Sequence, residues 1–156
     1  MTSEPAFNED FRDMLVSLLE AQVEFIIVGA HAMAVHGVPR ATGDIDILVR
    51  PSRENAVRVL AALRAFGAPI GQHGVTLSDF ERPERVYQIG LPPRRIDILT
   101  TITGVTFDEA WPARVPVDRD GLTLPFLGRE QLLTNKRATG RDKDLVDVKL
   151  LRAASS

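Results

Sequence analysis

Apolar and polar residues recur along the chain with two different periods, which together predict helices and strands in a mixed order. A spacing of three to four residues predicts four longer helices, over about 11–22, 52–67, 128–139 and 141–154. Short apolar runs rich in β-branched residues predict strands, over about 23–29, 44–50, 85–91, 94–101, 113–118 and 122–127. This order predicts an α/β (α+β) fold in which a small mixed β-sheet is backed by helices.

Local signals set several of the expected boundaries. Ser52 can cap the second long helix and Gly67 can end it. The first strand ends at Gly29, and the small residues after it predict a short helix over 30–37. Asp120 and Gly121 predict a tight turn between the last two strands. Segment 106–111 is expected to be a turn or a short helix, and the poorly patterned segment 68–85 a loop with an uncertain strand.

Length and composition limit the class of protein. The 156 residues suit one domain, with a core over about 24–127 and closing helices over about 128–154. With 44% apolar and 26% charged residues the chain is expected to fold. It has no cysteine, which excludes a disulfide scaffold and a thiolate metal site. The acidic N-terminus and the lack of a long apolar run predict no secretory signal and no membrane span, as in a cytoplasmic protein.

Charge is distributed unevenly along the chain. The net charge of −2 predicts no strong non-specific attraction to nucleic acid. From Gly128 onward, however, seven basic residues face four acidic ones, a local charge of +3 beside −5 for the remainder. A basic surface beside an acidic body suits a phosphate-bearing ligand. A pair of solvated amphipathic helices explains the same charges equally well.

Two aspartates stand at the start of the second strand, in "GDIDILV". Side chains alternate along a strand, so Asp44, Asp46 and Leu48 are expected on one face, and Ile45, Ile47 and Val49 in the core. The two carboxylates then repel each other, and a divalent cation such as Mg²⁺ relieves that repulsion. The alternative is two solvated aspartates on an exposed strand face.

A third isolated acid, Asp97, lies in "RRIDILTT", where the sequence Ile-Asp-Ile-Leu around Asp46 occurs again. If its strand lies beside the second one, Asp97 can meet Asp44 and Asp46 on one face. Three carboxylates can hold two metal ions for in-line phosphoryl or nucleotidyl transfer. Asp97 could equally form a salt bridge with Arg94 or Arg95.

Two neighbouring features suit an anionic ligand. Gly29 lies where the first strand runs into a helix, so backbone N–H groups are available and a phosphate could approach closely. Arg40, in the loop before the second strand, could reach a phosphate or neutralise Asp44. The alternatives are a simple tight turn at Gly29 and an ordinary surface arginine at position 40.

The combination of "IIVGA", "GDIDILV" and "RRIDILT" resembles the minimal nucleotidyltransferases of the DNA polymerase beta superfamily. The ending "NKRATGRDKDLVDVKLL" is similar to the closing helices of the abortive-infection type of nucleotidyltransferase toxins. In that ending, Lys136, Lys143, Asp144 and Asp147 match the pattern. The resemblance covers roughly Phe25 to Leu151.

This resemblance implies site residues and cofactors. Asp44, Asp46 and Asp97 would bind two Mg²⁺ ions, and Asp97 would help to activate the attacking hydroxyl. Gly29 and the following backbone, including Ala30, would hold the triphosphate of an NTP, and Lys136 or Lys143 would neutralise phosphate charge. Ala30 departs from the family, which commonly has Gly or Ser there, so the triphosphate contact is expected to be altered.

Other readings stay open for the basic residues. His31 could touch a nucleotide or be a hydrogen-bonded structural residue, and a zinc pair with His36 is not expected from their spacing. Lys143 and Asp147 could pair on one helix surface. Lys136 has no acidic residue one turn away on its own helix, which makes it the better phosphate ligand, though a free surface lysine explains it too.

The resulting hypothesis is a Mg²⁺-dependent nucleotidyltransferase that moves a nucleoside monophosphate from an NTP to an acceptor hydroxyl. The acceptor could be an RNA end such as that of tRNA, a protein or a small molecule, and a toxin–antitoxin role is possible in that setting. The alternative is a non-catalytic module that binds a nucleotide or, like an antitoxin, a protein partner; Ala30 and the short tail motivate it.

Overall fold

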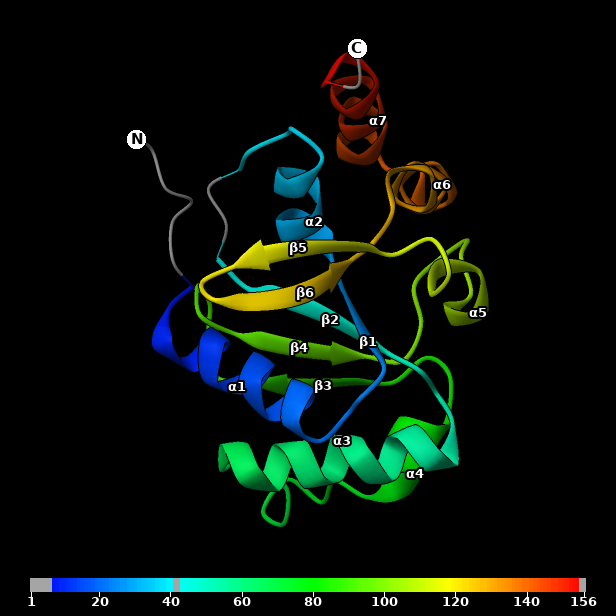
Figure 1. Ribbon diagram of the computed structural model, residues 1–156. Helices are drawn as coiled ribbons and strands as arrows, with labels where there is room; N and C mark the ends of the chain where they lie inside the picture. The colour runs from blue at the N-terminus through cyan, green and yellow to red at the C-terminus, as the bar shows by residue number, and fades with distance from the viewer. Residues whose placement is uncertain (1–6, 41–42, 155–156) are drawn as a thin grey trace.

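The protein forms one mixed β-sheet with helices on both faces (Figure 1). The computed structural model describes residues 7–40 and 43–154. The first six residues, on which the lack of a secretory signal partly rests, and Ala41 and Thr42 of the loop before the second strand lie outside these ranges. The helices are α1 (Glu9–Glu20), α2 (Gly29–Val35), α3 (Arg53–Phe66), α4 (Leu77–Glu81), α5 (Phe107–Ala110), α6 (Arg129–Thr139) and α7 (Asp142–Ala154).

The six strands follow the spatial order β3-β4-β2-β1-β6-β5. They are β1 (Phe25–Val28), β2 (Ile45–Val49), β3 (Val86–Ile89), β4 (Ile96–Leu99), β5 (Val115–Arg119) and β6 (Leu122–Phe126). The pairs β2–β4 and β1–β6 are parallel, and the pairs β3–β4, β1–β2 and β5–β6 are antiparallel. The predicted fold class, a small mixed sheet backed by helices, is confirmed.

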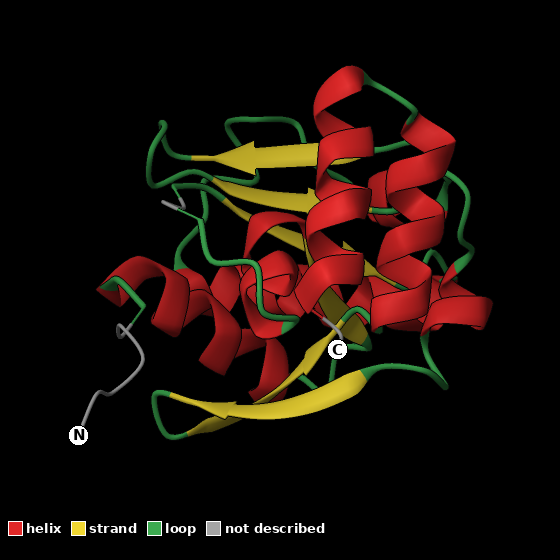
Figure 2. Ribbon diagram, turned by 90° about the horizontal axis from the view of Figure 1, so that it is seen from above, coloured by secondary structure: helices red, strands yellow, loops and turns green. Residues whose placement is uncertain are grey.

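The layers follow from the burial of both sheet faces. Helices α1, α3 and α4 cover one face, and α2, α6 and α7 lie on the other (Figures 1 and 2). Ile45, Ile47 and Val49 are fully buried, as their alternation predicts, and Leu48 is buried as well. Asp46 is thus the only residue of β2 that is half-buried, while the other four are buried. A carboxylate in a central strand with apolar neighbours on both sides calls for a specific partner.

The local signals act as their chemistry predicts. The Ser52 hydroxyl accepts a hydrogen bond from the Asn55 N–H, and Gly67 ends α3 in the left-handed conformation with φ of 93°. Asp120 and Gly121 both have positive φ, 53° and 77°, the conformation of a tight hairpin turn.

The segment 68–85 is where the sequence prediction was wrong. It was expected to be a loop with an uncertain strand, and it contains helix α4. Thr76 and Asp79 form a capping box at the start of α4, and Phe80 anchors the helix in the core with 1% exposure. The Thr-x-x-Asp signal was present in the sequence, but one buried residue per turn gives too short a pattern to show a helical period.

Among the described residues, no helix is long and apolar enough to cross a membrane.

Candidate active site

The register of the two central strands brings Asp46 and Asp97 together. Strands β2 and β4 run parallel, and Asp46 lies directly beside Asp97 in the ladder. Their side chains therefore project from the same face, and they are hydrogen-bonded to each other. Asp97 is only 6% exposed. Two carboxyl groups can share a hydrogen bond only if one of them carries a proton.

The environment of Asp46 favours that proton. Burial raises its pKa to about 7, and the hydrogen bond to Asp97 and the charges of Asp97 and Asp44 act in the same direction. Arg95 lowers it, but to a smaller extent. The site thus concentrates more negative charge than its surroundings neutralise, which is the electrostatic condition for binding a cation.

Arg95 is the one cation in contact with these carboxylates among the described residues. Its Nε lies 2.7 Å from Asp97 Oδ1, and its Nη2 lies 3.2 Å from Asp44 Oδ2. The Arg95 backbone N–H also donates to Asp44 Oδ1 at 3.0 Å. The salt bridge that the sequence left open for Asp97 is therefore formed, by Arg95. We call Asp44, Asp46, Asp97 and Arg95 the acid cluster; it holds three carboxylates and one guanidinium.

These contacts bear on whether the site fits a metal ion. Asp46 and Asp97 on adjacent strands, with Asp44 just before β2, supply the oxygen ligands that Mg²⁺ prefers. In the described part of the chain, however, no three acidic or histidine side chains already surround a common cation position. The Arg95 guanidinium instead lies between Asp44 and Asp97 and pairs with both. The donor set fits a divalent cation, provided that the half-buried Arg95 side chain moves aside.

Gly29 packs directly against Asp46. Its φ is +70°, and a Cβ added there would lie 2.5 Å from Asp46 Oδ2. Val28, at the end of β1, pairs with Asp46 in the antiparallel register, which explains the close approach. Helix α2 then begins without a side-chain cap at Val28, and Ala30 lies in its first turn. A glycine is required here both for the backbone conformation and for space.

Two of the predicted basic ligands, Arg40 and Lys136, meet at the closing helices. Lys136 Nζ lies 2.9 Å from Asp147 Oδ2 and 3.7 Å from Asp144 Oδ1. Arg40 forms an ion pair with Asp147, and Arg141 Nε lies 2.7 Å from Asp144 Oδ2. We call Arg40, Lys136, Arg141, Asp144 and Asp147 the closing cluster; it holds three cations and two buried carboxylates.

This arrangement corrects two readings of the sequence. Lys136 has no acidic partner along its own helix, but α7 supplies two, so it is not a free surface lysine. Arg40 pairs with Asp147 and does not neutralise Asp44. Asp147 forms ion pairs with Arg40 and Lys136, and Lys143, the partner suggested by helix spacing, is exposed. Arg141 was not predicted as a site residue. Its position three residues before Asp144 was the sequence signal for this ion pair.

The electrostatics of the closing cluster differ from those of the acid cluster. The hydrogen bond from the Arg141 guanidinium holds the pKa of Asp144 well below its usual range, despite burial. Burial lowers the pKa of Lys136, and Asp144 partly offsets this. Both carboxylates here are paired with cations, so the cluster ties the 37–40 segment, α6 and α7 together.

His31 and His36 contact aromatic rings and a backbone carbonyl oxygen, respectively. His31 packs against Phe7 and Phe11, with ring centroids 5.7 and 6.1 Å away, and burial lowers its pKa. Its Nε2 is buried without a hydrogen-bond partner among the described residues. His36 Nε2 instead lies 2.7 Å from the Leu127 carbonyl oxygen. These contacts explain both rings as parts of the packing around α2.

Comparisons with known proteins identify the fold. No protein-family model and no curated protein matches the chain. Among solved structures, TM1012 from Thermotoga maritima, which is assigned as a nucleotidyltransferase, superposes with a TM-score of 0.54 at 18% identity, over 92% of this chain and 88% of that one.

Two antibiotic-modifying enzymes are similar in the same way. The lincosamide adenylyltransferase LnuA has a TM-score of 0.54 at 13% identity, over 97% of this chain and all of its own. ANT(2")-Ia, solved with adenylyl-2"-tobramycin, has a TM-score of 0.57 at 13% identity, over 94% and 87% of the two chains. The chain is therefore similar to nucleotidyltransferases in its fold.

Proposed function

We propose that this protein is a nucleotidyltransferase that transfers a nucleoside monophosphate from an NTP to an acceptor hydroxyl. The observation that carries the proposal is that Asp46 and Asp97 lie side by side on one face of the sheet, with Asp44 joined to them through Arg95, and that the group has excess negative charge. In the closing cluster every buried carboxylate is paired with a protein cation, whereas the acid cluster holds three carboxylates and only one guanidinium, an imbalance that a divalent cation would relieve.

The residues have distinct roles in the reaction. The acceptor oxygen forms a bond to the α-phosphorus, the bond from that phosphorus to the pyrophosphate oxygen breaks, and pyrophosphate leaves. Asp44, Asp46 and Asp97 would hold two Mg²⁺ ions. When bound, Mg²⁺ neutralises phosphate charge and lowers the pKa of the acceptor hydroxyl. Asp97 would orient that hydroxyl, whose proton passes to solvent.

Phosphate contacts come from the backbone and the closing cluster. The Gly29 and Ala30 N–H groups at the uncapped start of α2 lie beside Asp46 and would donate to the triphosphate. Arg40 and Lys136 would supply positive charge, because the closing cluster holds three cations and only two carboxylates. Lys143, an exposed residue of α7, would add to it. His31 has no part in this proposal, because it packs against α1.

A small-molecule acceptor suits the structure best. A cavity of about 420 Å³ opens at the C-terminal ends of β2 and β4, with Leu48, Ile102, Val105 and Phe107 among its lining residues. Leu48 follows Asp46 by two positions and so faces the same side of the sheet, about 7 Å further along the strand. LnuA and ANT(2")-Ia are described with small antibiotics bound or adenylylated. RNA or protein acceptors remain predictions that incorporation assays can test.

The decisive experiment is the double variant Asp44→Asn, Asp46→Asn. We expect it to lose Mn²⁺ and NTP binding, measured by titration calorimetry, and to lose transfer from α-labelled NTP to an acceptor panel by at least about a thousandfold. Asp13→Asn, an exposed acid on α1, is the matched control and should behave as the wild type. Unchanged metal and nucleotide binding in the double variant would refute the site.

One observation favours a second function, a non-catalytic nucleotide-binding or antitoxin-like module. Arg95 already bridges Asp44 and Asp97, and a permanent guanidinium there would replace the metal. The variant Arg95→Met separates the two cases. In an enzyme, the wild type binds Mn²⁺ and Arg95→Met binds it more tightly in the absence of nucleotide. In a non-catalytic module, the wild type binds no Mn²⁺ at any concentration that saturates the variant.

A further inference from the structure

The two edges of the sheet are built differently. The edge strand β5 carries Pro116 and ends in Asp118 and Arg119, the devices by which natural sheets prevent further strand addition. The other edge strand, β3, has the sequence Val-Tyr-Gln-Ile, without a proline or a charge. Its Val86 is 56% exposed, and Leu91 just beyond the strand is 80% exposed. Strand β3 is therefore an edge that is open to pairing.

The register determines which backbone groups of β3 point outward. The Thr100 N–H donates to the Arg85 carbonyl, so this pair is hydrogen-bonded across the β3–β4 ladder. In an antiparallel ladder, hydrogen-bonded and non-hydrogen-bonded pairs alternate. Every second residue from Arg85 thus bonds to β4, while the N–H and C=O groups of Val86 and Gln88 point away from the sheet.

We propose that a second copy of this chain pairs with β3 in antiparallel orientation about a two-fold axis at Tyr87. Val86 then lies opposite the partner's Gln88, and Gln88 opposite the partner's Val86. The outward groups of each pair exchange two hydrogen bonds, about four in all. This match is self-complementary, as an isologous interface requires. It joins two six-stranded sheets into one continuous sheet.

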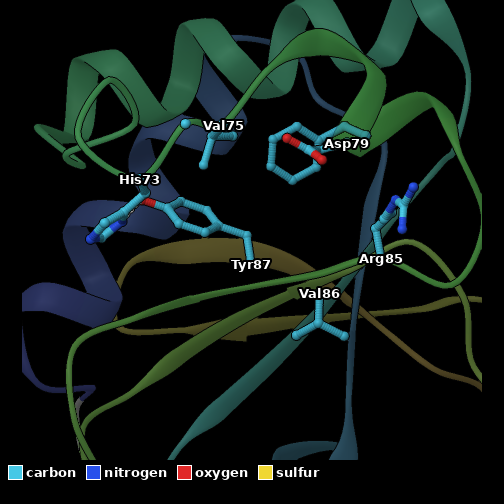
Figure 3. A pocket seen from close by; sticks show the side chains of 8 residues that line it. His73, Val75, Asp79, Arg85, Val86 and Tyr87 are labelled. Carbon is cyan, nitrogen blue, oxygen red and sulfur yellow. Dashed lines mark hydrogen bonds between the residues drawn. The ribbon is translucent and has the colours of Figure 1, made fainter.

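A pocket beside β3 lies next to the proposed interface, and both apolar and charged side chains line it. It measures about 220 Å³, and its lining includes His73, Val75, Phe80 and Tyr87. Figure 3 shows Tyr87 on the pocket side of the strand, beside His73, and Val86 pointing to the opposite side. By alternation, Arg85, Tyr87 and Ile89 share the pocket side. The partner's Ile89, opposite Arg85, and the partner's Tyr87 then lie at the mouth of this pocket.

The pairing places both acid clusters on one surface. Gln88 lies opposite Asp97 in the β3–β4 ladder, so the two side chains share a face. A two-fold axis normal to the sheet keeps that face common to both copies. The two Asp97 positions are then separated by three strand spacings, about 15 Å. The pairing rests on the edge strand alone, so it stands or fails independently of the catalytic proposal.

Association in solution tests the proposal. We expect the wild type to reach twice its mass of 17.2 kDa in sedimentation equilibrium at about 100 µM protein. Val86→Lys places a charge on the edge and should weaken association at least about tenfold. Val57→Lys makes the same change at a valine of α3 with 53% exposure and should leave association unchanged. A monomeric wild type, or dimerisation unaffected by Val86→Lys, would overturn the proposal.

Because the chain contains no cysteine, the register can be tested by disulfide trapping. The two Tyr87 positions form the non-hydrogen-bonded pair at the axis, where the Cα atoms approach to about 4.5 Å, a distance that a disulfide spans. We expect Tyr87→Cys to give a covalent dimer under mild oxidation, and Val57→Cys to stay monomeric. Equal, slow oxidation of both variants would exclude this register even if the protein dimerises.

Discussion

Asp46 and Asp144 are both carboxylates held inside the protein, yet their proton affinities shift in opposite directions. Asp46 shares a strand face with two further acids and one arginine, and its pKa is raised to about 7. Asp144 is bound by Arg141 and lies near Lys136, and its pKa is lowered. Burial opposes the charge of both groups, so the partners decide the sign. The excess of carboxylates in the acid cluster suits it to bind a cation, whereas in the closing cluster each carboxylate is paired with protein cations, which suits it to hold elements together.

The largest expected effect that separates the two clusters is on stability. Asp147→Asn leaves Arg40 and Lys136 without their shared carboxylate and should lower the free energy of unfolding by about 3 kcal/mol. Asp46→Asn removes a mutually repelling charge and should be neutral or stabilising by about 1 kcal/mol. Urea unfolding of both variants measures the difference. Equal losses would mean that the acid cluster is structural too.

The pH dependence of stability should have opposite signs in the two clusters. Because Asp46 holds its proton more tightly in the folded chain, the folded state binds more protons than the unfolded one between about pH 4 and 7. Its contribution to stability therefore falls as the pH rises through that window. Asp144 contributes stability above about pH 4, which is lost only at lower pH.

Thermal midpoints at pH 5 and pH 8 test this sign. The decline attributed to Asp46 should disappear in Asp46→Asn, while the loss below pH 4 should remain. A decline in that variant as steep as in the wild type would assign the effect to another group.

The smallest expected effect concerns the glycine beside the acid cluster. Gly29→Ala combines a positive φ with a clash against Asp46, whereas Gly67→Ala has a positive φ of 93° and no atom within 4 Å of the added Cβ. We expect Gly67→Ala to cost about 1 kcal/mol of unfolding free energy and Gly29→Ala about 1 kcal/mol more. Equal losses of unfolding free energy in the two variants, measured with urea, would show that the Asp46 side chain can move away from residue 29.

Much of the fold was readable because its signals are local. The caps of α3, the turn at Asp120 and Gly121, and the alternation in β2 each depend on a few adjacent residues. Helix α4 was missed because its only buried residue is Phe80 and its signal is the capping box at Thr76. The pattern of a short helix held by one anchor is too brief to distinguish from a loop.

The partners of the charged residues were beyond the reach of the sequence. Lys136 was read as unpaired because Leu132 and Gly140 flank it one turn away, and the fold then brings Asp144 and Asp147 from α7. Arg40 was placed near Asp44 by proximity in sequence, and it pairs with Asp147, 107 residues away. Long flexible side chains choose partners by spatial distance, which no local pattern encodes.

The sequence by itself determined that Asp46 stands in an apolar strand, with Asp44 just before it in the structure, and that Asp97 stands in a similar apolar strand. It left open whether these strands are neighbours. Only the tertiary structure decided that β2 and β4 pair in parallel with Asp46 beside Asp97, and that Arg95 is the cation bound between Asp44 and Asp97. The physical reason is that side-chain direction follows from the period of a strand, whereas strand order and register are set by the packing of the whole core.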